Sequence, residues 1–256
     1  MDLNARQLGS PGHPHVLIAH GLFGSASNWQ TIARQLESDF CLWLVDLRNH
    51  GNSPHSDDMT YPDMAQDLAL FIDTHCAGRA ALIGHSMGGK AAMAAALSYP
   101  DKVQSLMVMD SAPISHRSAF EAYIEAMMSI DLYRLESRAQ ADNALSQVVP
   151  EAGVRAFLLQ NLRSMDNAWT WRINLPVLAK SLPTLSAFPE FSGRFSGPVR
   201  FLRGGDSDYV PMDVAEQYSH LFPDASAQTI NNAGHWLHAQ QPERVTKAIQ
   251  SFLATT

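Results

Sequence analysis

The sequence has little cysteine and little positive charge. Two cysteines, Cys41 and Cys76, occur in 256 residues, each in apolar or helical surroundings. A disulfide scaffold needs more pairs than this, so the sequence predicts two reduced thiols in a cytoplasmic protein. The 18 lysines and arginines are outnumbered by 25 acidic residues, which gives a formal net charge of -7. A nucleic-acid partner is disfavoured, because phosphate binding requires a positive surface.

Long hydrophobic runs are also missing. No stretch approaches the roughly 18 apolar residues that span a bilayer. Residues 1–14, MDLNARQLGSPGHP, have neither the basic flank nor the apolar segment of a signal peptide. Hydrophobic residues still make up 46% of the chain, enough for a sizeable core. The composition therefore predicts an intracellular globular protein without a membrane span, built as one large or two small domains.

Strand-like and helix-like segments alternate over most of the chain. Short apolar runs typical of strands lie at 15–19, 41–45, 80–84, 103–110, 198–205 and 225–230. Segments with helical spacing lie at 28–36, 64–75, 90–98, 212–221 and 242–253. Near-continuous apolar strands separated by helices indicate a parallel sheet with helices on both faces.

Residues 114–190 interrupt this alternation. They contain helical patterns such as AFEAYIEAMMSI and VRAFLLQNL, and no convincing strand. A structureless loop of this length is improbable, so the stretch is expected to fold as a subdomain. The sequence therefore predicts a core formed by 1–113 and 191–256, with a helical cap over 114–190.

The pentapeptide GHSMG places Ser86 between a predicted strand and a predicted helix. The central residue of so tight a turn is forced into a strained conformation. Gly84 and Gly88 remove the side chains that would collide as the strand and the helix approach. The bend would lift the Ser86 hydroxyl above the carboxyl end of the strand, where open α/β sheets bind ligands. We interpret Ser86 as a nucleophile rather than as a turn residue or a helix cap.

A serine hydroxyl needs a base to take its proton. His235 lies in NNAGHWLHAQQPERV, in a glycine-containing loop between the last predicted strand and the final helix, and is our candidate for the base. His238, three residues further on, is expected to be a pocket wall or a surface residue. His20 and His85 flank the catalytic turns, and we assign them structural roles through hydrogen bonds.

Two amides are candidates for holding the negative oxygen of a reacting carbonyl. Met87 begins the helix after Ser86, so its amide points into the same space. In IAHGLFGS, Gly21 ends the first central strand and allows the backbone to approach the substrate. The amide of Leu22 is then the expected partner of Met87. Such donors contribute about 3 to 4 kcal/mol each to stabilising a transition state.

A third group must orient the imidazole of the base, and three aspartates are candidates. Asp110 ends the strand that follows the nucleophile helix. Asp206 and Asp208 lie in GGDSDYVP, after a later strand, in the loop that usually carries the acid in this architecture. Anchoring that loop on its Val-Pro pair puts Ser207 at the usual aspartate position. We favour Asp110, with Asp206 as the alternative and Asp208 as the third choice.

Together these residues resemble the α/β-hydrolase superfamily over nearly the whole chain. The segments HGLFGS, DLRNHGNSP, YPDMAQDL, GHSMGGKAAM, DSAP and NAGHWLHA are similar to the YbfF-type bacterial esterases and their mitochondrial relatives. The resemblance implies a mostly parallel sheet flanked by helices, with a helical cap between strands 6 and 7. It also implies carboxylesterase or thioesterase activity and an acid after the sixth strand, which is the position of Asp110. The chain departs from the pattern at Asp206, where such relatives often carry asparagine.

Three further residues have candidate roles. Arg48, in DLRNHGNSP, is expected to pin local carbonyls, or alternatively to contact a charged part of the substrate. Trp169 and Trp171 are candidates for the wall of the acyl site, although tryptophans in such a position are more often core residues.

The sequence thus predicts a serine hydrolase acting on esters or thioesters of short to medium acyl chains, without a metal or an organic cofactor. The alternatives are a ligand-binding pseudo-hydrolase and, on the same fold, a carbon–carbon hydrolase, a lactonase or a perhydrolase. Epoxide hydrolase and dehalogenase chemistry is disfavoured, because it needs a carboxylate at position 86. The sequence does not indicate the oligomeric state.

Overall fold

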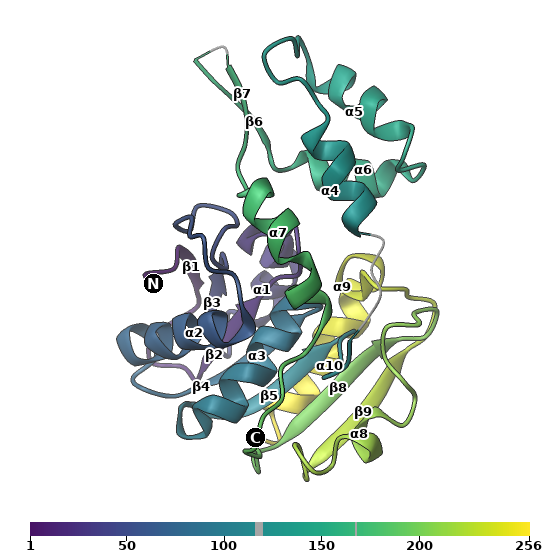
Figure 1. The fold of residues 1–256 in the computed structure, drawn as a ribbon. Coiled ribbons are helices and arrows are strands. Elements are labelled where there is room, and N and C mark those ends of the chain that lie inside the picture. The colour runs from purple at the N-terminus through teal and green to yellow at the C-terminus, as the bar shows by residue number, and fades with distance from the viewer. Residues whose placement is uncertain (116–119, 167) are drawn as a thin grey trace.

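The central element of the fold is a twisted sheet. A computed structural model of the chain describes residues 1–115, 120–166 and 168–256. Within these ranges, seven strands form one sheet in the order β1-β3-β2-β4-β5-β8-β9 (Figure 1). These strands are β1 (Ala5–Leu8), β2 (His15–Ala19), β3 (Cys41–Val45), β4 (Ala80–His85), β5 (Val103–Met109), β8 (Val199–Gly204) and β9 (Ala225–Ile230). All neighbours are parallel except β1, which is antiparallel to β3. The mostly parallel sheet that the sequence predicted is confirmed.

Helices cover both faces of the sheet, because successive side chains of the central strands point to opposite sides. In β2, Leu17 packs toward α2 and α3, whereas Ile18 packs toward α1 and α10. Helices α2 (Tyr61–His75) and α3 (Met87–Ser98) cover the first face of the sheet. Helices α1 (Gln30–Leu36) and α10 (Pro242–Leu253) cover the second face. Shorter helical turns are η1 (Ala26–Trp29), η2 (Pro100–Lys102), α8 (Val214–Gln217) and α9 (Leu237–Gln240).

The long segment between β5 and β8, called the insertion from here on, forms its own group of elements beyond the carboxyl edge of the sheet (Figure 1). It contains α4 (Phe120–Met128), α5 (Arg138–Ser146), α6 (Ala152–Leu159), β6 (Leu162–Met165), β7 (Ala168–Trp171) and α7 (Leu175–Ser186). Helix α7 runs from this group back to the core. Residues 116–119 and 167 of the predicted cap lie outside the described residues.

The structure corrects three details of the predicted elements. The expectation of no strand in the insertion was wrong, since β6 and β7 form a two-stranded antiparallel sheet. These strands are only four residues long and pair only with each other, so they carry no apolar run. The edge strand β1 was not predicted. The helix expected near 212–221 is only the four residues of α8, because the chain turns so that buried Phe222 can contact Phe201.

Both cysteines are buried free thiols. Burial raises the pKa of Cys41, and it raises the pKa of Cys76 to about 12. Neither thiol is therefore ionised at neutral pH. A search of the described ranges finds no helix that is long and apolar enough to cross a bilayer.

Candidate active site

The bend predicted at Ser86 is present where β4 passes into α3. Ser86 has φ 53° and ψ -118°, a backbone conformation that residues other than glycine rarely adopt. A Cβ added at Gly84 would lie 2.2 Å from the Gly88 carbonyl oxygen, and one added at Gly88 would lie 2.4 Å from the His20 carbonyl oxygen. The strand and the helix therefore approach so closely that glycine is needed on both sides of the serine.

His235 connects Ser86 to Asp110. The Nε2 atom of His235 is 3.0 Å from Ser86 Oγ, and its Nδ1 atom is 2.8 Å from Asp110 Oδ2. Because the carboxylate can only accept at neutral pH, Nδ1 carries the proton and Nε2 is left to accept from the Ser86 hydroxyl. The fold thus brings these three predicted residues together from three separate loops.

Asp110 is fully buried at the end of β5, with φ 44°. Its Oδ1 accepts from the Gly204 amide at 2.9 Å, and its Oδ2 accepts from the Ser207 hydroxyl as well as from His235. Ser207 is the residue that the Val-Pro anchor placed at the usual acid position. It therefore supports the carboxylate of Asp110 instead of supplying one.

The alternative acids lie elsewhere. The side chains of Asp206 and Asp208 are both exposed, and neither forms a hydrogen bond or ion pair with His235 within the described residues. The backbone of Asp206 has a structural part, since its amide donates to the Ala233 carbonyl at 2.9 Å. The geometry around His235 thus favours Asp110 over both.

Tyr209 contacts His235 from the side and was not singled out from the sequence. The two rings stack with centroids 3.9 Å apart and an interplanar angle of 23°. Burial raises the pKa of Tyr209 to about 12, so its hydroxyl stays neutral. Stacking limits the tilt of the imidazole, and the only sequence signal was an aromatic residue next to the Val-Pro pair.

The chain at Gly21 and Leu22 lies close to Ser86. A Cβ added at Gly21 would lie 2.9 Å from His85 Nδ1 and 3.2 Å from Ser86 Cβ, so a side chain here would press on both residues. Met87 is the first residue of α3, and the first amides of a helix have no acceptor within the helix. Leu22 and Met87, whose amides were predicted to hold the oxyanion, both line a cavity at Ser86.

Two buried histidines hold the loop that carries Leu22. The Nε2 atom of His20 accepts from the Leu47 amide at 3.0 Å, which leaves its Nδ1 to donate to the Gly21 carbonyl at 2.8 Å. His50 accepts in the same way from the Phe23 amide at 3.2 Å. Burial lowers the pKa of His20 and lowers the pKa of His50 to about 3, so both rings stay neutral.

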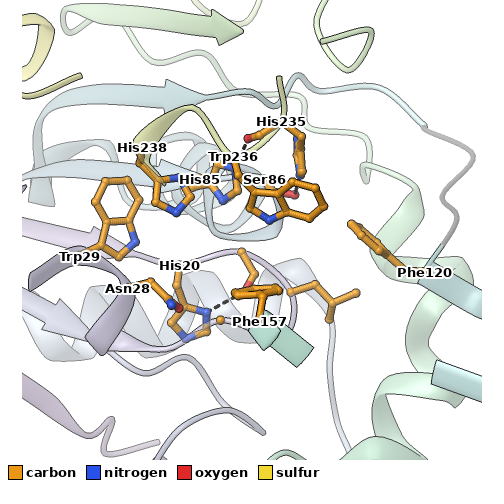
Figure 2. Close-up of a pocket in the computed structure, with 13 residues that line it drawn as sticks. His20, Asn28, Trp29, His85, Ser86, Phe120, Phe157, His235, Trp236 and His238 are labelled. Atoms are coloured by element: carbon orange, nitrogen blue, oxygen red, sulfur yellow. Dashed lines mark hydrogen bonds between the residues drawn. The ribbon is translucent and has the colours of Figure 1, made fainter. Parts of the chain in front are cut away.

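His85 lies beside the His235 imidazole, and His238 lies beside His85 (Figure 2). His85 Nε2 donates to the His235 carbonyl oxygen at 2.8 Å, and burial lowers the pKa of His85 well below its usual value. His238 stacks on Trp29 with ring centroids 4.7 Å apart, and burial lowers its pKa to about 4. Their arrangement agrees with the structural role expected for His85 and with His238 as a pocket wall.

Two cavities meet at Ser86. The inner chamber, drawn in Figure 2, has a volume of about 10 Å³ and is lined by His20, Gly21, Leu22, Gly24, Asn28, Trp29, His85, Ser86, Phe120, Phe157, His235, Trp236 and His238. The α3–α7 cavity has a volume of about 50 Å³ and is lined by Leu22, Tyr61, Ser86, Met87, Lys90, Ser111, Phe120, Leu182, Leu185, Ser186 and Tyr209. A reacting group at Ser86 can therefore extend in two directions.

The two predicted tryptophans are not brought to these cavities. Trp169 and Trp171 lie on β7, in a hairpin that extends away from the sheet (Figure 1), and neither belongs to the residues that line the inner chamber or the α3–α7 cavity. Trp169 instead lies under the Arg138 guanidinium at 6.0 Å. The insertion instead lines these cavities with Phe120, Phe157 and Leu182, which the sequence analysis did not single out.

Lys90 and Asn161 are among the side chains that fasten the insertion to the core. Lys90, one helical turn after Ser86, donates to the carbonyls of Ser186 and Ala187 at the end of α7, at 2.9 and 3.0 Å. Burial lowers the pKa of this lysine to about 8. Asn161 donates to the Phe23 carbonyl at 2.8 Å, beside the loop that carries Leu22.

Arg48 lines neither of the two cavities at Ser86. Its guanidinium donates to the Asp67 carboxylate at 2.7 Å and to the Asp58 carbonyl at 2.8 Å, which agrees with its expected role in pinning the loop. Within the described ranges, no group of three or more histidine, cysteine, aspartate or glutamate residues is arranged to hold a metal ion.

Comparisons with known proteins agree with this architecture. The family model for the alpha/beta hydrolase fold matches residues 14–242. A Mus musculus protein named sn-1-specific diacylglycerol lipase ABHD11 is 41% identical over 249 residues, which cover 94% of this chain and 81% of that protein. Esterase YbfF of Escherichia coli (strain K12) is 36% identical over 239 residues, 93% of this chain and 92% of that protein. The solved structure of a marine microorganism esterase superposes with a TM-score of 0.94 at 36% identity, over 98% of this chain and 99% of that one. The chain therefore belongs to the α/β-hydrolase fold family.

Proposed function

We propose that the chain is a serine esterase that hydrolyses esters of short- to medium-chain acids through an acyl-enzyme. The observation that carries the proposal is the hydrogen-bonded path from Ser86 Oγ through His235 to Asp110, which begins at a strained bend between two cavities. The names of the relatives, esterase and lipase, support the same reaction class.

In the first half of the reaction, Ser86 Oγ attacks the acyl carbonyl while His235 Nε2 takes the hydroxyl proton. The amides of Leu22 and Met87 stabilise the resulting oxyanion. The carboxylate of Asp110 stabilises the imidazolium and holds it in the reactive orientation. When the tetrahedral intermediate collapses, His235 gives the proton to the leaving alkoxide and Ser86 keeps the acyl group.

In the second half, a water molecule takes the place of the alcohol. His235 removes its proton, the resulting hydroxide attacks the acyl carbon, and a second tetrahedral intermediate forms at the same amides. Collapse returns the proton from His235 to Ser86 and releases the carboxylic acid. All proton transfers use Nε2 of one imidazole, since Nδ1 remains bound to Asp110.

We further propose that residues 114–190 act as a cap on a core formed by 1–113 and 191–256. The support is that Phe120, Phe157 and Leu182, all from the insertion, line the cavities beside Ser86. The acyl group would enter the α3–α7 cavity, which Met87 lines. Its volume of about 50 Å³ favours short chains.

The test is the loss of activity in Ser86→Ala, with the exposed Ser38→Ala as the control. We expect hydrolysis of p-nitrophenyl butyrate to fall by about 10³-fold or more in the first variant and to stay unchanged in the second. A fluorophosphonate probe should label the wild type at Ser86 within minutes. An unlabelled wild type without turnover would instead indicate a ligand-binding protein. Assays of lactone hydrolysis, of carbon–carbon bond hydrolysis and of peracid formation test the alternative lactonase, carbon–carbon hydrolase and perhydrolase activities.

A further inference from the structure

We propose that an open groove between α6 and α9 binds the leaving-group alcohol of the substrate, and that this alcohol is uncharged and several carbons long. The inference rests on the ester hydrolysis proposed above and specifies its leaving group. The groove, called the α6–α9 groove, has a volume of about 500 Å³. Its walls include Val154, Ala156 and Phe157 from α6, and Trp236, Ala239 and Gln240 from the other side.

Proton transfer decides on which side of Ser86 the alcohol lies. The leaving oxygen must receive its proton from His235 Nε2, so the alcohol extends from Ser86 toward His235. His235 lines the inner chamber, whereas it does not line the α3–α7 cavity. The alcohol is therefore directed into the inner chamber, and the acyl group is left with the opposite cavity.

The inner chamber is too small to contain a large alcohol. A volume of about 10 Å³ is about the space that one water molecule needs. Asn28, Phe157, Trp236 and His238 line both the inner chamber and the α6–α9 groove. Figure 2 shows Phe157 and Trp236 on the walls of the chamber, and their ring centroids are 6.2 Å apart. An alcohol longer than one or two carbons must pass these two rings into the groove.

The walls of the α6–α9 groove do not suit a phosphorylated leaving group such as coenzyme A. Among the residues that line it, Glu151 is the one side chain charged at neutral pH, because the pKa of His238 is lowered to about 4. The nearby Arg155 is bound to the Asp142 carboxylate at 2.9 Å and to the Val149 carbonyl at 3.0 Å. Phosphates are bound by arginine, lysine or amide donors. The groove instead offers apolar walls with the neutral amides of Asn28 and Gln160, which hydrogen-bond to each other at 3.1 Å.

The first experiment fills the groove. Ala156 is exposed on the wall of the groove, and Ala156→Trp would occupy part of it; Ala139→Trp makes the same change on the exposed side of α5. The measurement is the ratio of kcat/KM for hexyl butyrate to that for methyl butyrate. We expect Ala156→Trp to lower this ratio at least tenfold relative to the wild type, and Ala139→Trp to leave it unchanged. An unchanged ratio in Ala156→Trp would overturn the proposal.

The second experiment tests charge. The wild type is expected to hydrolyse hexyl butyrate with a kcat/KM at least tenfold above that for butyryl-CoA, and Ala156→Lys is expected to narrow this difference several-fold. A wild type that prefers butyryl-CoA would overturn the assignment of an uncharged alcohol. Failure of the underlying function looks different, since wild type and Ser86→Ala would then hydrolyse methyl butyrate equally slowly.

Discussion

The carboxylate of Asp110 accepts three hydrogen bonds, one at Oδ1 and two at Oδ2, which faces His235. The Gly204 amide holds one oxygen, while the Ser207 hydroxyl and His235 Nδ1 share the other. Tyr209 stacks on the imidazole and restricts its tilt. The direction in which His235 Nε2 points is thus determined by a buried carboxylate that accepts three hydrogen bonds and by a flat aromatic surface.

This arrangement ranks the two candidate acids. We expect Asp110→Asn to lower kcat for p-nitrophenyl butyrate by about 10³- to 10⁴-fold, because an amide at this position can donate to Nδ1 and favour the unreactive tautomer. Asp206→Asn should change kcat less than threefold, because the side chain of Asp206 is exposed. The opposite ranking would assign the role of acid to Asp206.

At this scale the sequence identified residues that have strong local signatures. The glycine spacing around Ser86 and the loop that contains His235 can each be recognised from a few neighbouring residues. Ser207 and Tyr209 have no such signature, because their roles depend on the approach of the loop after β8 to the end of β5. The same approach is what makes Asp110 preferable to Asp206, so the sequence could only rank the two.

Helix α7 is the element through which the insertion is fastened to the nucleophile helix. Lys90 of α3 donates to two carbonyls at the end of α7, where the last carbonyls of a helix have no partner within it. Tyr61 contributes a further bond, from its hydroxyl to the Leu185 carbonyl at 2.6 Å. The wall of the α3–α7 cavity therefore depends on bonds from buried polar groups of the core.

Removing the ammonium group should loosen this helix. We expect Lys90→Met to lower the free energy of unfolding by about 1 to 3 kcal/mol, since two half-buried carbonyls lose a charged donor while the alkyl stem is kept. Urea unfolding measures the change, and hydrogen exchange should show faster exchange in the last turn of α7. The control Lys180→Met alters an exposed lysine of α7 itself. Equal stability and exchange in both variants would contradict the role of Lys90.

Among the elements, the central strands were predictable because they are buried on both faces and therefore appear as unbroken apolar runs. The hairpin of β6 and β7 was not, since most of its residues are partly or fully exposed and the pairing is confined to eight residues. The tryptophans of β7 were proposed as pocket residues only because of their residue type. Their hairpin extends away from the sheet, which no local pattern indicates.

At the scale of the whole molecule, four of the histidines that the structure describes are buried around the site and stay neutral. Burial lowers the pKa of His20 and His85, and it lowers those of His50 and His238 to about 3 and about 4. In the unfolded chain each histidine would titrate near 6.5. Below that pH the unfolded state binds protons that the folded state does not, so the free energy of unfolding must fall as the pH falls.

Between pH 7 and pH 5, His50 and His238 should each remove about 2 kcal/mol from the free energy of unfolding. Urea unfolding at the two pH values measures the loss. In His238→Gln the loss should be smaller by about 2 kcal/mol than in the wild type. In His220→Gln, which alters an exposed histidine, it should be unchanged. The same loss in both variants would show that burial of His238 is not linked to protonation.

The two buried thiols have a practical consequence. Cys41 and Cys76 are shielded from bulk reagents, and their raised pKa values leave almost no thiolate for a maleimide to attack. Tyr133, between α4 and α5, is fully exposed. Tyr133→Cys would accordingly take up a single dye in an otherwise native chain, and the emission of that dye would report changes in its surroundings between α4 and α5 while the enzyme turns over.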